Sequence, residues 1–371
     1  MADTSSNAPL VVIGAGGTGG HMFPASAFAA EMKSRGWRVG LMTDERGRIY
    51  TDGFPADWII NVKAATFASK RPDKLLGAGL KILSGVKDAQ KKLKAEQASL
   101  VAGFGGYPAF PALAAAQRAH IPIIIHEQNA VLGRVNRFFA GKARVVACGF
   151  ERLDRLPARA AGNKHVVGNP VRAPILAIGD EAFPPVGEAD KLQLLVIGGS
   201  QGARLFGEVI PPAICHLPEE IRARLKVVQQ VRAEQLDTVT AKYSAAGVEA
   251  ELSPFFSNMP ELLASSHMVI SRSGASSVTE LAVVGRSSLL VPLAIAMDDH
   301  QTGNAETLRD AGAADVVAEG EFTPDRITAI LTERLSDAEG LKARGAAARS
   351  VGKLSASSDL ADLAEAAAEQ S

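Results

Sequence analysis

The chain has 371 residues, and its 40 basic and 40 acidic side chains give a formal net charge of zero. With 47% apolar and 22% charged residues, the composition is that of a globular protein, and the balanced charge argues against a nucleic-acid-binding protein with one basic face. A chain of this length predicts two domains. Its two cysteines, Cys148 and Cys215, lie far apart in apolar stretches, which indicates two buried thiols in a reducing compartment.

Neither a signal peptide nor a membrane-spanning helix is predicted. The first ten residues lack a charged segment followed by a long apolar one, and no run reaches the roughly 18 apolar residues of a spanning helix. These features predict a cytoplasmic protein that does not cross a membrane, although they are compatible with docking on a membrane surface.

The N-terminal half alternates short apolar runs with segments of helical spacing. An apolar run at 10–13 ends at a glycine turn, a helix is predicted from 22 to 34, and the next strand from 38 to 44. Further strands are predicted at 100–106, 121–127 and 144–150. Strand, turn, helix and strand in succession form a βαβ unit, which predicts a parallel sheet covered on both faces.

This alternation stops at 159–175, where Gly, Asn and Pro recur, and we place an inter-domain linker there. A second strand, glycine turn and helix follow at 192–206. Later strands are predicted at 225–231, 268–274 and 288–293, and a short amphipathic helix at 360–370. The predicted fold is α/β, with two Rossmann-like parallel-sheet domains that face a deep cleft.

Glycine turns follow three of the predicted strands, at 14–20 (GAGGTGG), 103–107 (GFGGY) and 198–203 (GGSQGA). Such a turn lets a ligand approach the backbone, and the N–H groups at the start of the next helix favour phosphate. The first turn contains G-x-G-x-x-G and Asp44 ends the next strand, so an NAD- or flavin-dependent oxidoreductase is one interpretation. The recurrence of the turns favours the alternative, a cleft that holds two separate phosphorylated substrates.

Polar side chains cluster beside these turns. His21 directly follows the first turn, where an imidazole can transfer a proton near neutral pH. The run HEQN at 126–129 stands at the carboxyl end of a strand, where open α/β sheets bind ligands. Glu280 falls near the second turn of a predicted helix, where a carboxylate can accept two ribose hydroxyls. Asp298 and Asp299 predict a helix N-cap rather than a metal site.

Seven segments together resemble the MurG-type glycosyltransferase family, which transfers N-acetylglucosamine from UDP to undecaprenyl-pyrophosphoryl-muramoyl-pentapeptide in peptidoglycan synthesis. They are GGTGGHMFPA, GFGGYPAFPAL, HEQNAVLGRVNRF, VGNPVR, GGSQGARLF, SRSGASSVTELAVVGRSSLLVP and DDHQTGNA, in the family's order from about residue 10 to 315. The resemblance implies a GT-B fold with an acceptor and membrane-docking domain at 1–167, a UDP-sugar domain at 168–350, and a C-terminal helix at 351–371 that packs on the first domain.

The resemblance also implies roles for individual residues. His21 is the first candidate for the general base, and His126 and Glu127 come second. The implied donor-binding residues are Thr18, Gly19, Gly20, Asn129, Arg172, Ser200, Phe256, Ala275, Glu280 and Gln301. The implied acceptor-binding residues are Gly16, Gly17, Gly105, Gly106, Tyr107 and Asn136.

Within the donor set, the resemblance places Arg172 and Ser200 on the diphosphate and Phe256 against uracil. Glu280 would bind the ribose hydroxyls, and Asn129 and Gln301 the N-acetylglucosamine. His300 departs from the family, which often carries a second glutamine there, and this puts in doubt how one sugar hydroxyl is recognised.

The implied reaction converts an α-linked donor into a β(1→4) product and therefore inverts C1 in a single in-line displacement. A base takes the proton from the muramoyl 4-hydroxyl, and the charge on the departing UDP is stabilised by turn N–H groups, the helix dipole and Arg172. No cofactor and no metal ion are required by any motif, because these groups can neutralise the diphosphate.

Residues 61–100 carry nine basic and three acidic side chains, interleaved with the apolar run LLGAGLKIL at 75–83. An apolar patch with a basic rim suits an anionic membrane surface. Together with the implied polyprenyl acceptor, it predicts peripheral docking on the cytoplasmic face of the bacterial inner membrane, and no nucleic-acid partner. The alternatives are an oxidoreductase, a UDP-sugar transferase with another acceptor, an epimerase-like enzyme and a UDP-sugar sensor.

Overall fold

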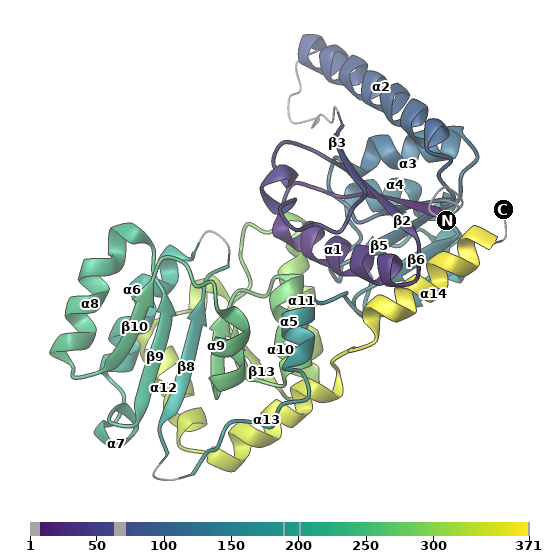
Figure 1. The fold of residues 1–371 in the computed structure, drawn as a ribbon. Helices are drawn as coiled ribbons and strands as arrows, with labels where there is room; N and C mark the ends of the chain where they lie inside the picture. Colours follow the sequence, from purple (N-terminus) through teal and green to yellow (C-terminus); the bar gives the residue numbers. More distant parts are fainter. Residues whose placement is uncertain (1–7, 63–71, 188–189, 200–201, 370–371) are drawn as a thin grey trace. The chain divides into compact units, whose positions relative to one another are not determined.

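The computed structural model describes residues 8–62, 72–187, 190–199 and 202–369 (Figure 1). The chain divides into two compact units, and each is described by itself. One unit consists of Met1–Arg172 together with Ser355–Ser371, and the other of Ala173–Leu354.

The first unit is built on a sheet of seven parallel strands in the order β3-β2-β1-β4-β5-β6-β7. Its strands are β1 (Leu10–Gly14), β2 (Arg38–Thr43), β3 (Trp58–Asn61), β4 (Leu100–Gly103), β5 (Ile123–Glu127), β6 (Val145–Cys148) and β7 (Lys164–Val166). Its α-helices are α1 (Gly19–Ser34), α2 (Pro72–Ala95), α3 (Ala109–Arg118), α4 (Arg134–Phe139) and α14 (Ala356–Glu369). Its 3₁₀ helices are η2 (Gly47–Tyr50), η3 (Ala140–Lys142) and η4 (Ala158–Asn163).

Both faces of this sheet are buried. Successive strand residues point to opposite faces, so Val11 and Ile13 pack with α1 and α14, whereas Leu10 and Val12 pack with α2 and α3. A parallel sheet covered on both faces needs apolar residues at consecutive positions. This requirement explains why the run at 10–13 contains no polar residue.

Helix α14 covers one face of the first sheet although it lies at the far end of the chain (Figure 1). Its apolar side, which includes Leu360, is buried beside α1. At the end of α1, the guanidinium of Arg35 forms ion pairs with Asp362 (2.6 Å) and Glu365 (2.8 Å), and the indole N–H of Trp37 donates to Glu365 (3.0 Å). Apolar burial and charge pairing therefore both attach this helix to the first unit.

The second unit contains a sheet of six parallel strands in the order β10-β9-β8-β11-β12-β13. Its strands are β8 (Leu192–Ile197), β9 (Leu225–Gln230), β10 (Glu249–Ser253), β11 (Met268–Ser271), β12 (Ser287–Leu290) and β13 (Ala314–Val316). Its α-helices are α5 (Ala173–Ala177), α6 (Arg204–Cys215), α7 (Glu219–Arg222), α8 (Leu236–Ala245), α9 (Met259–Ser265), α10 (Ala275–Val284), α11 (His300–Asp310), α12 (Pro324–Leu335) and α13 (Ala338–Ser350). Its 3₁₀ helices are η5 (Ala233–Gln235), η6 (Met297–Asp299) and η7 (Glu319–Glu321).

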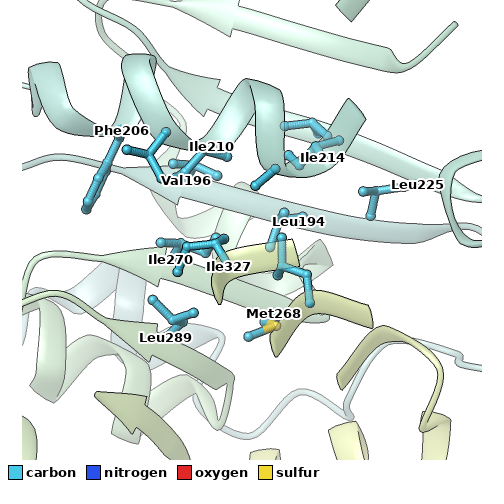
Figure 2. Close-up of a cluster of buried hydrophobic side chains, with 14 of the residues drawn as sticks. Leu194, Val196, Phe206, Ile210, Ile214, Leu225, Met268, Ile270, Leu289 and Ile327 are labelled. Atoms are coloured by element: carbon cyan, nitrogen blue, oxygen red, sulfur yellow. The ribbon is translucent and has the colours of Figure 1, made fainter. Parts of the chain in front are cut away.

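The core of the second unit forms where α6 and α12 pack on the central strands. Figure 2 shows Leu194 and Val196 of β8 beside Phe206 and Ile210 of α6, with Ile327 of α12 in the same cluster. These side chains are fully buried, and burial of a large aliphatic side chain contributes roughly 1.5–3 kcal/mol. This core holds the carboxyl ends of β8 and β11 in place.

The strand order reverses at one point in each sheet, between β1 and β4 and between β8 and β11. At such a point the connecting helices diverge to opposite faces, and the crevice at the carboxyl ends of the strands binds ligands in open α/β sheets. The glycine turns after β1 and β4 stand at the first reversal, and the turns after β8 and β11 stand at the second.

The two parallel-sheet α/β domains are confirmed. The sequence did not predict β3, β7, β10 and β13, which are the edge strands of the two sheets. An edge strand is partly exposed and needs no continuous apolar run. The prediction of a linker at 159–175 was wrong in its first half, because β7 lies there and pairs with β6. Of the two free cysteines, Cys148 is buried as predicted, whereas Cys215 is only half-buried.

Candidate active site

The glycine turns after β1 and β4 touch each other. Gly17, Gly105 and Gly106 have positive φ angles of 87°, 88° and 73°, which side chains other than glycine rarely adopt. A Cβ on Gly106 would lie 2.7 Å from the carbonyl oxygen of Gly16, and a Cβ on Gly16 would lie 2.7 Å from the ring of Pro108. The contact therefore requires glycine in both turns. Half-buried Tyr107 belongs to the second turn.

His21 lies in the first turn of α1, whose first two residues are Gly19 and Gly20. Its Nδ1 is 3.3 Å from the hydroxyl of Thr18, and its Nε2 is 3.2 Å from the point that a Cβ on Gly105 would occupy. The imidazole is half-buried. The ring predicted to transfer a proton thus lies against both glycine turns.

Asp44 points into the first turn. Its Oδ1 accepts the backbone N–H groups of Gly17 (3.1 Å) and Gly47 (2.9 Å). In the dinucleotide interpretation this carboxylate would accept ribose hydroxyls instead. The acid on which that interpretation depends is already bonded within the protein.

His126 is buried at the end of β5. Its Nε2 is 2.9 Å from the carbonyl oxygen of Gly168, and its Nδ1 is 3.0 Å from the amide nitrogen of Gln128. Since the carbonyl can only accept, Nε2 carries the proton and Nδ1 accepts from Gln128. Burial lowers the pKa of His126 to about 4. The imidazole is therefore neutral at physiological pH, with both ring nitrogens engaged.

Glu127, which is also buried, shapes the loop that follows β5. Its Oε1 accepts the backbone N–H (3.1 Å) and side-chain amide (3.2 Å) of Asn129. Its Oε2 accepts the N–H of Gly133 and the side-chain amide of Asn136, both at 2.9 Å. Asn136 also donates to the carbonyl of His126 (3.1 Å). The HEQN segment is thus a connected polar network, with Asn129 half-buried at its edge.

Arg172 lies at the end of the first unit and faces α1. Its guanidinium carbon is 4.8 Å from the centre of the Phe23 ring, which packs so closely on Gly19 that a Cβ there would lie 2.9 Å away. A cation held on an aromatic ring beside the helix start suits a diphosphate. Asn169, which precedes Arg172 in the VGNPVR segment, donates to the carbonyl of Gln128 (3.0 Å). This bond connects the segment to the HEQN network.

In the second unit, the turn after β8 has positive φ at Gly199 (88°) and Gly202 (66°). The N–H of Gly198 donates to the side chain of Gln230 (3.0 Å). Ser200, predicted to bind the diphosphate, lies outside the described residues. Phe256, predicted to contact uracil, is half-buried in the loop after β10.

The turn after β11 leads into α10, with Gly274 at the N-cap and buried Ala275 as the first helical residue. The hydroxyls of Ser273 and Ser276 are buried and have no hydrogen-bond partner among the described residues. Glu280 is half-buried in the second turn of α10, where the sequence predicted it. Polar groups therefore line the start of this helix.

The loop before α11 orients Gln301. Its Oε1 accepts the N–H of Leu293 (3.0 Å), and its Nε2, which has no hydrogen-bond partner among the described residues, can donate to a ligand. Asp298 and Asp299 have positive φ angles of 58° and 53°. Asp299 occupies the predicted N-cap position, but its carboxylate accepts the hydroxyl of Thr302 (2.7 Å) and caps no backbone N–H. The N-cap prediction is thus confirmed for the position of Asp299, although its side chain makes no capping bond.

Residue 300 carries the imidazole that departs from the family pattern. The Nδ1 of His300 is 2.7 Å from the carbonyl oxygen of Met297, so this nitrogen donates. The ring is fixed to the loop before α11 by one nitrogen only among the contacts described.

An ion pair that the sequence did not predict supports the same loop. Arg272 contacts Glu319 (2.5 Å) and donates to the carbonyl of Val291 (3.2 Å). The second carboxylate oxygen of Glu319 accepts the N–H of Ala294 (3.1 Å). Arg272 belongs to the quoted SRSG segment, but its partner lies 47 residues further along the chain, and no local pattern announces it.

Two family models match the chain, the glycosyltransferase family 28 N-terminal domain at residues 11–148 and the family 28 C-terminal domain at residues 193–364. Two curated relatives carry the name UDP-N-acetylglucosamine--N-acetylmuramyl-(pentapeptide) pyrophosphoryl-undecaprenol N-acetylglucosamine transferase. The protein of Maricaulis maris (strain MCS10) is 50% identical, covering 94% of this chain and 95% of its own. The protein of Caulobacter vibrioides (strain NA1000 / CB15N) is 51% identical, covering 96% and 98%.

Solved structures agree with these relatives. The crystal structure of Acinetobacter baumannii MurG matches with a TM-score of 0.79 and 31% identity over 96% of this chain and 99% of that chain. A UDP-N-acetylglucosamine 2-epimerase matches with a TM-score of 0.62 but only 13% identity over 96% and 95%, which shows the fold alone. With about half of its residues identical to the curated relatives over nearly its whole length, the chain belongs to glycosyltransferase family 28, among the MurG-type N-acetylglucosaminyltransferases.

Proposed function

We propose that this chain transfers N-acetylglucosamine from UDP-N-acetylglucosamine to the 4-hydroxyl of the muramoyl sugar in undecaprenyl-pyrophosphoryl-MurNAc-pentapeptide, a step of peptidoglycan synthesis. The observation that carries the proposal is the 50% identity, over 94% of the chain, to a relative named for this transfer. The glycine turns at both strand-order reversals support it, because a transfer between two pyrophosphate-bearing substrates needs two such binding places.

His21 is the residue we propose as general base. Its half-buried ring lies beside both glycine turns of the first unit, within reach of a ligand at the switch point. His126 is less suited, since its pKa is about 4 and Gly168 and Gln128 engage both ring nitrogens. Glu127 accepts four N–H groups that shape its own loop. A base must reach the substrate hydroxyl, and of the three side chains His21 meets this condition best.

The donor is proposed to bind through side chains and helix starts, without a cofactor or a resident metal ion. In the first unit, Arg172 and the N–H groups at the start of α1 are proposed to bind phosphate. In the second unit, the N–H groups at the start of α10 are proposed to stabilise the charge that develops on UDP. Glu280 would accept the ribose hydroxyls, and the Nε2 of Gln301 would donate to the sugar. Retention of activity after exhaustive dialysis against EDTA tests the metal-free part of the proposal.

The first experiment measures UDP release from UDP-N-acetylglucosamine with and without a short-chain lipid-pyrophosphoryl-MurNAc-pentapeptide. The variants are His21→Ala and, as a control, His165→Ala, which removes an exposed imidazole of edge strand β7. We expect acceptor-dependent UDP release, at least about 100-fold slower in His21→Ala with UDP binding retained and unchanged in His165→Ala. Absence of UDP release by the wild type with acceptor present would refute the transferase proposal. Full activity of His21→Ala would refute the assignment of the base alone.

We further propose that the first unit docks on an anionic membrane surface. A cavity of about 470 Å³ lies between α2, α3 and α4, and its lining includes Leu83 and Phe138, which are 53% and 54% exposed. Exposed Arg118 and Lys142 line the same cavity, and exposed Lys81 lies on α2. An apolar surface with a basic rim attracts anionic lipids by about 1 kcal/mol per basic residue.

The extent of this surface is only partly described. Lys63, Lys70 and Arg71 of the basic segment predicted from sequence lie outside the described residues, as do the side chains of residues 72–78 and 80. In the part of the chain that the structure describes, every helix is too short or too polar to span a bilayer. The proposed location is therefore peripheral, on the cytoplasmic face of the inner membrane that holds the polyprenyl acceptor.

Vesicle sedimentation tests the docking proposal. Wild type should sediment with phosphatidylglycerol-containing vesicles and be released by high salt, whereas a Leu83→Ser, Phe138→Ser double variant should remain in the supernatant. A matched control places the same changes at Phe255 and Ile295, exposed apolar residues of the second unit. Equal sedimentation of wild type and the Leu83→Ser, Phe138→Ser variant would refute docking through this surface.

A further inference from the structure

Asp44 is a charged residue beside the first glycine turn. The roles that the family resemblance implies do not include it. It directly follows β2, which lies next to β1 in the sheet. Because the carboxyl ends of neighbouring parallel strands share one edge, Asp44 stands beside the turn that follows β1. Its side chain is only 18% exposed.

One oxygen of Asp44 connects two loops. Oδ1 accepts the N–H of Gly17 at 3.1 Å and the N–H of Gly47, the first residue of η2, at 2.9 Å. Gly17 has a φ of 87°, a conformation that its own residue type permits but does not enforce. The bond from its N–H to Oδ1 of Asp44 selects one orientation of this peptide.

The first glycine turn, Asp44 and η2 are closely packed. A Cβ on Gly16 would lie 2.8 Å from Oδ1 of Asp44 and 2.9 Å from the hydroxyl of Thr43. A Cβ on Gly47 would lie 3.1 Å from the Cα of Gly16. The carboxylate and both glycines are therefore in direct contact, and the length of the aspartate side chain sets the distance between the turn and η2.

Displacement of this turn would reach the proposed base. The carbonyl of Gly16 touches Gly106 in the second turn, and the next turn residue but one, Thr18, contacts His21. The imidazole lies between Thr18 of the first turn and Gly105 of the second. A shift of Gly16 and Gly17 would therefore move the groups on both sides of the ring.

A negative charge beside a phosphate-binding turn would by itself repel the substrate. Oδ2 of Asp44 lies 3.6 Å from Nε of Arg46, whose guanidinium also approaches Gly17, since a Cβ there would be 3.5 Å from Nη2. This exposed cation compensates the carboxylate. The contribution of Asp44 is then the geometry of its acceptor oxygen rather than its charge.

We propose that Asp44 is a positioning residue for glycosyl transfer, which holds the first glycine turn at the distance that places His21 beside the reacting hydroxyl. The inference rests on the proposed transferase function. It predicts that asparagine at position 44 supports transfer, because its amide offers an acceptor oxygen at the same distance from the backbone. Glutamate, whose carboxylate is one methylene further out, should not support it.

The test compares Asp44→Asn with Asp44→Glu, and uses Asp52→Asn and Asp52→Glu at an exposed position of the next loop as matched controls. We expect kcat of acceptor-dependent UDP release to stay within about threefold of wild type in Asp44→Asn and to fall at least about tenfold in Asp44→Glu. The melting temperature should remain that of the controls. A loss in kcat at an unchanged melting temperature is not produced by general destabilisation.

Hydrogen exchange provides a readout that is independent of activity. The amides of residues 14–20 should exchange faster in Asp44→Glu and at the wild-type rate in Asp44→Asn. Activity lost in Asp44→Asn but kept in Asp44→Glu would overturn the proposal in favour of a charge role, and wild-type behaviour of both variants would overturn it as well. A wild type without acceptor-dependent UDP release would refute the transferase function, while the exchange rates would still decide whether Asp44 positions the turn.

Discussion

Replacement of Gly105 by alanine displaces the proposed base without changing its side-chain chemistry. Gly105 has a φ of 88°, and an added Cβ would lie 3.1 Å from Cδ2 and 3.2 Å from Nε2 of His21. These separations are shorter than ordinary contacts, so the imidazole must move by a few tenths of an ångström. Because a displacement of about 1 Å can lower a rate about 100-fold, we expect kcat to fall about tenfold.

The same substitution also carries a conformational cost, and a control separates the two effects. Alanine in the left-handed region costs roughly 1–2 kcal/mol relative to glycine. Gly53 has a φ of 70° with nothing within 4 Å of an added Cβ, so Gly53→Ala pays this cost far from the ring. Both variants should show a similar decrease in melting temperature, and only Gly105→Ala should lose kcat.

The assay is steady-state UDP release with saturating donor and acceptor, together with calorimetric measurement of UDP binding. We expect the Kd for UDP to be the same in both variants. If Gly105→Ala and Gly53→Ala have equal kcat values, the position of the His21 ring does not limit the reaction, and the reasoning that makes it the base is refuted.

Three further predictions concern hydrogen-bonded polar side chains. Arg286 is fully buried and donates four hydrogen bonds of 2.7–3.0 Å to backbone carbonyls. Arg286→Met should therefore lower the free energy of unfolding, measured by urea titration, by about 3 kcal/mol. A loss below about 1 kcal/mol would contradict this prediction. His126 has a pKa of about 4, below its ordinary value of 6.5, so the unfolded state binds more protons between these values and the protein should lose stability as the pH falls from 6.5 towards 4. That loss, about 3 kcal/mol in total, should shrink in His126→Gln when urea unfolding is compared at pH 7.5 and 4.5, and an unchanged pH dependence would disprove it. Gln301→Glu keeps the acceptor for the N–H of Leu293 but removes the Nε2 donor. The KM for UDP-N-acetylglucosamine should therefore rise at least about tenfold, without a change in melting temperature. A rise below about twofold would show that this donor does not contact the sugar.

Local sequence patterns were sufficient for the central part of both sheets. The run at 10–13 predicted β1 because a strand buried on both faces must be apolar at consecutive positions, and Leu10 and Val12 face one helical layer while Val11 and Ile13 face the other. Edge strands do not meet this requirement. The three residues of β7 are partly exposed, and their segment was mistaken for a linker.

Among the site residues, the glycines were the most predictable. Gly17, Gly105 and Gly106 have the positive φ angles that their residue type suggests. His21 follows the first turn in sequence, but only the fold brings it beside Gly105. The roles within HEQN were less accessible. Sequence alone could not show that His126 bonds to Gly168, 42 residues away, or that Glu127 is enclosed by donors of its own loop.

The sequence by itself determined the α/β class, the order of the glycine turns and the family to which the chain belongs, since these depend on residue type and spacing along the chain. The tertiary structure decided which polar side chains are bonded within the protein. Asp44 directly follows a strand, where a ribose-binding acid would stand, yet its carboxylate accepts the N–H groups of Gly17 and Gly47. Only the neighbouring strand decides this, because a hydrogen bond forms with whatever donor the fold brings within about 3 Å.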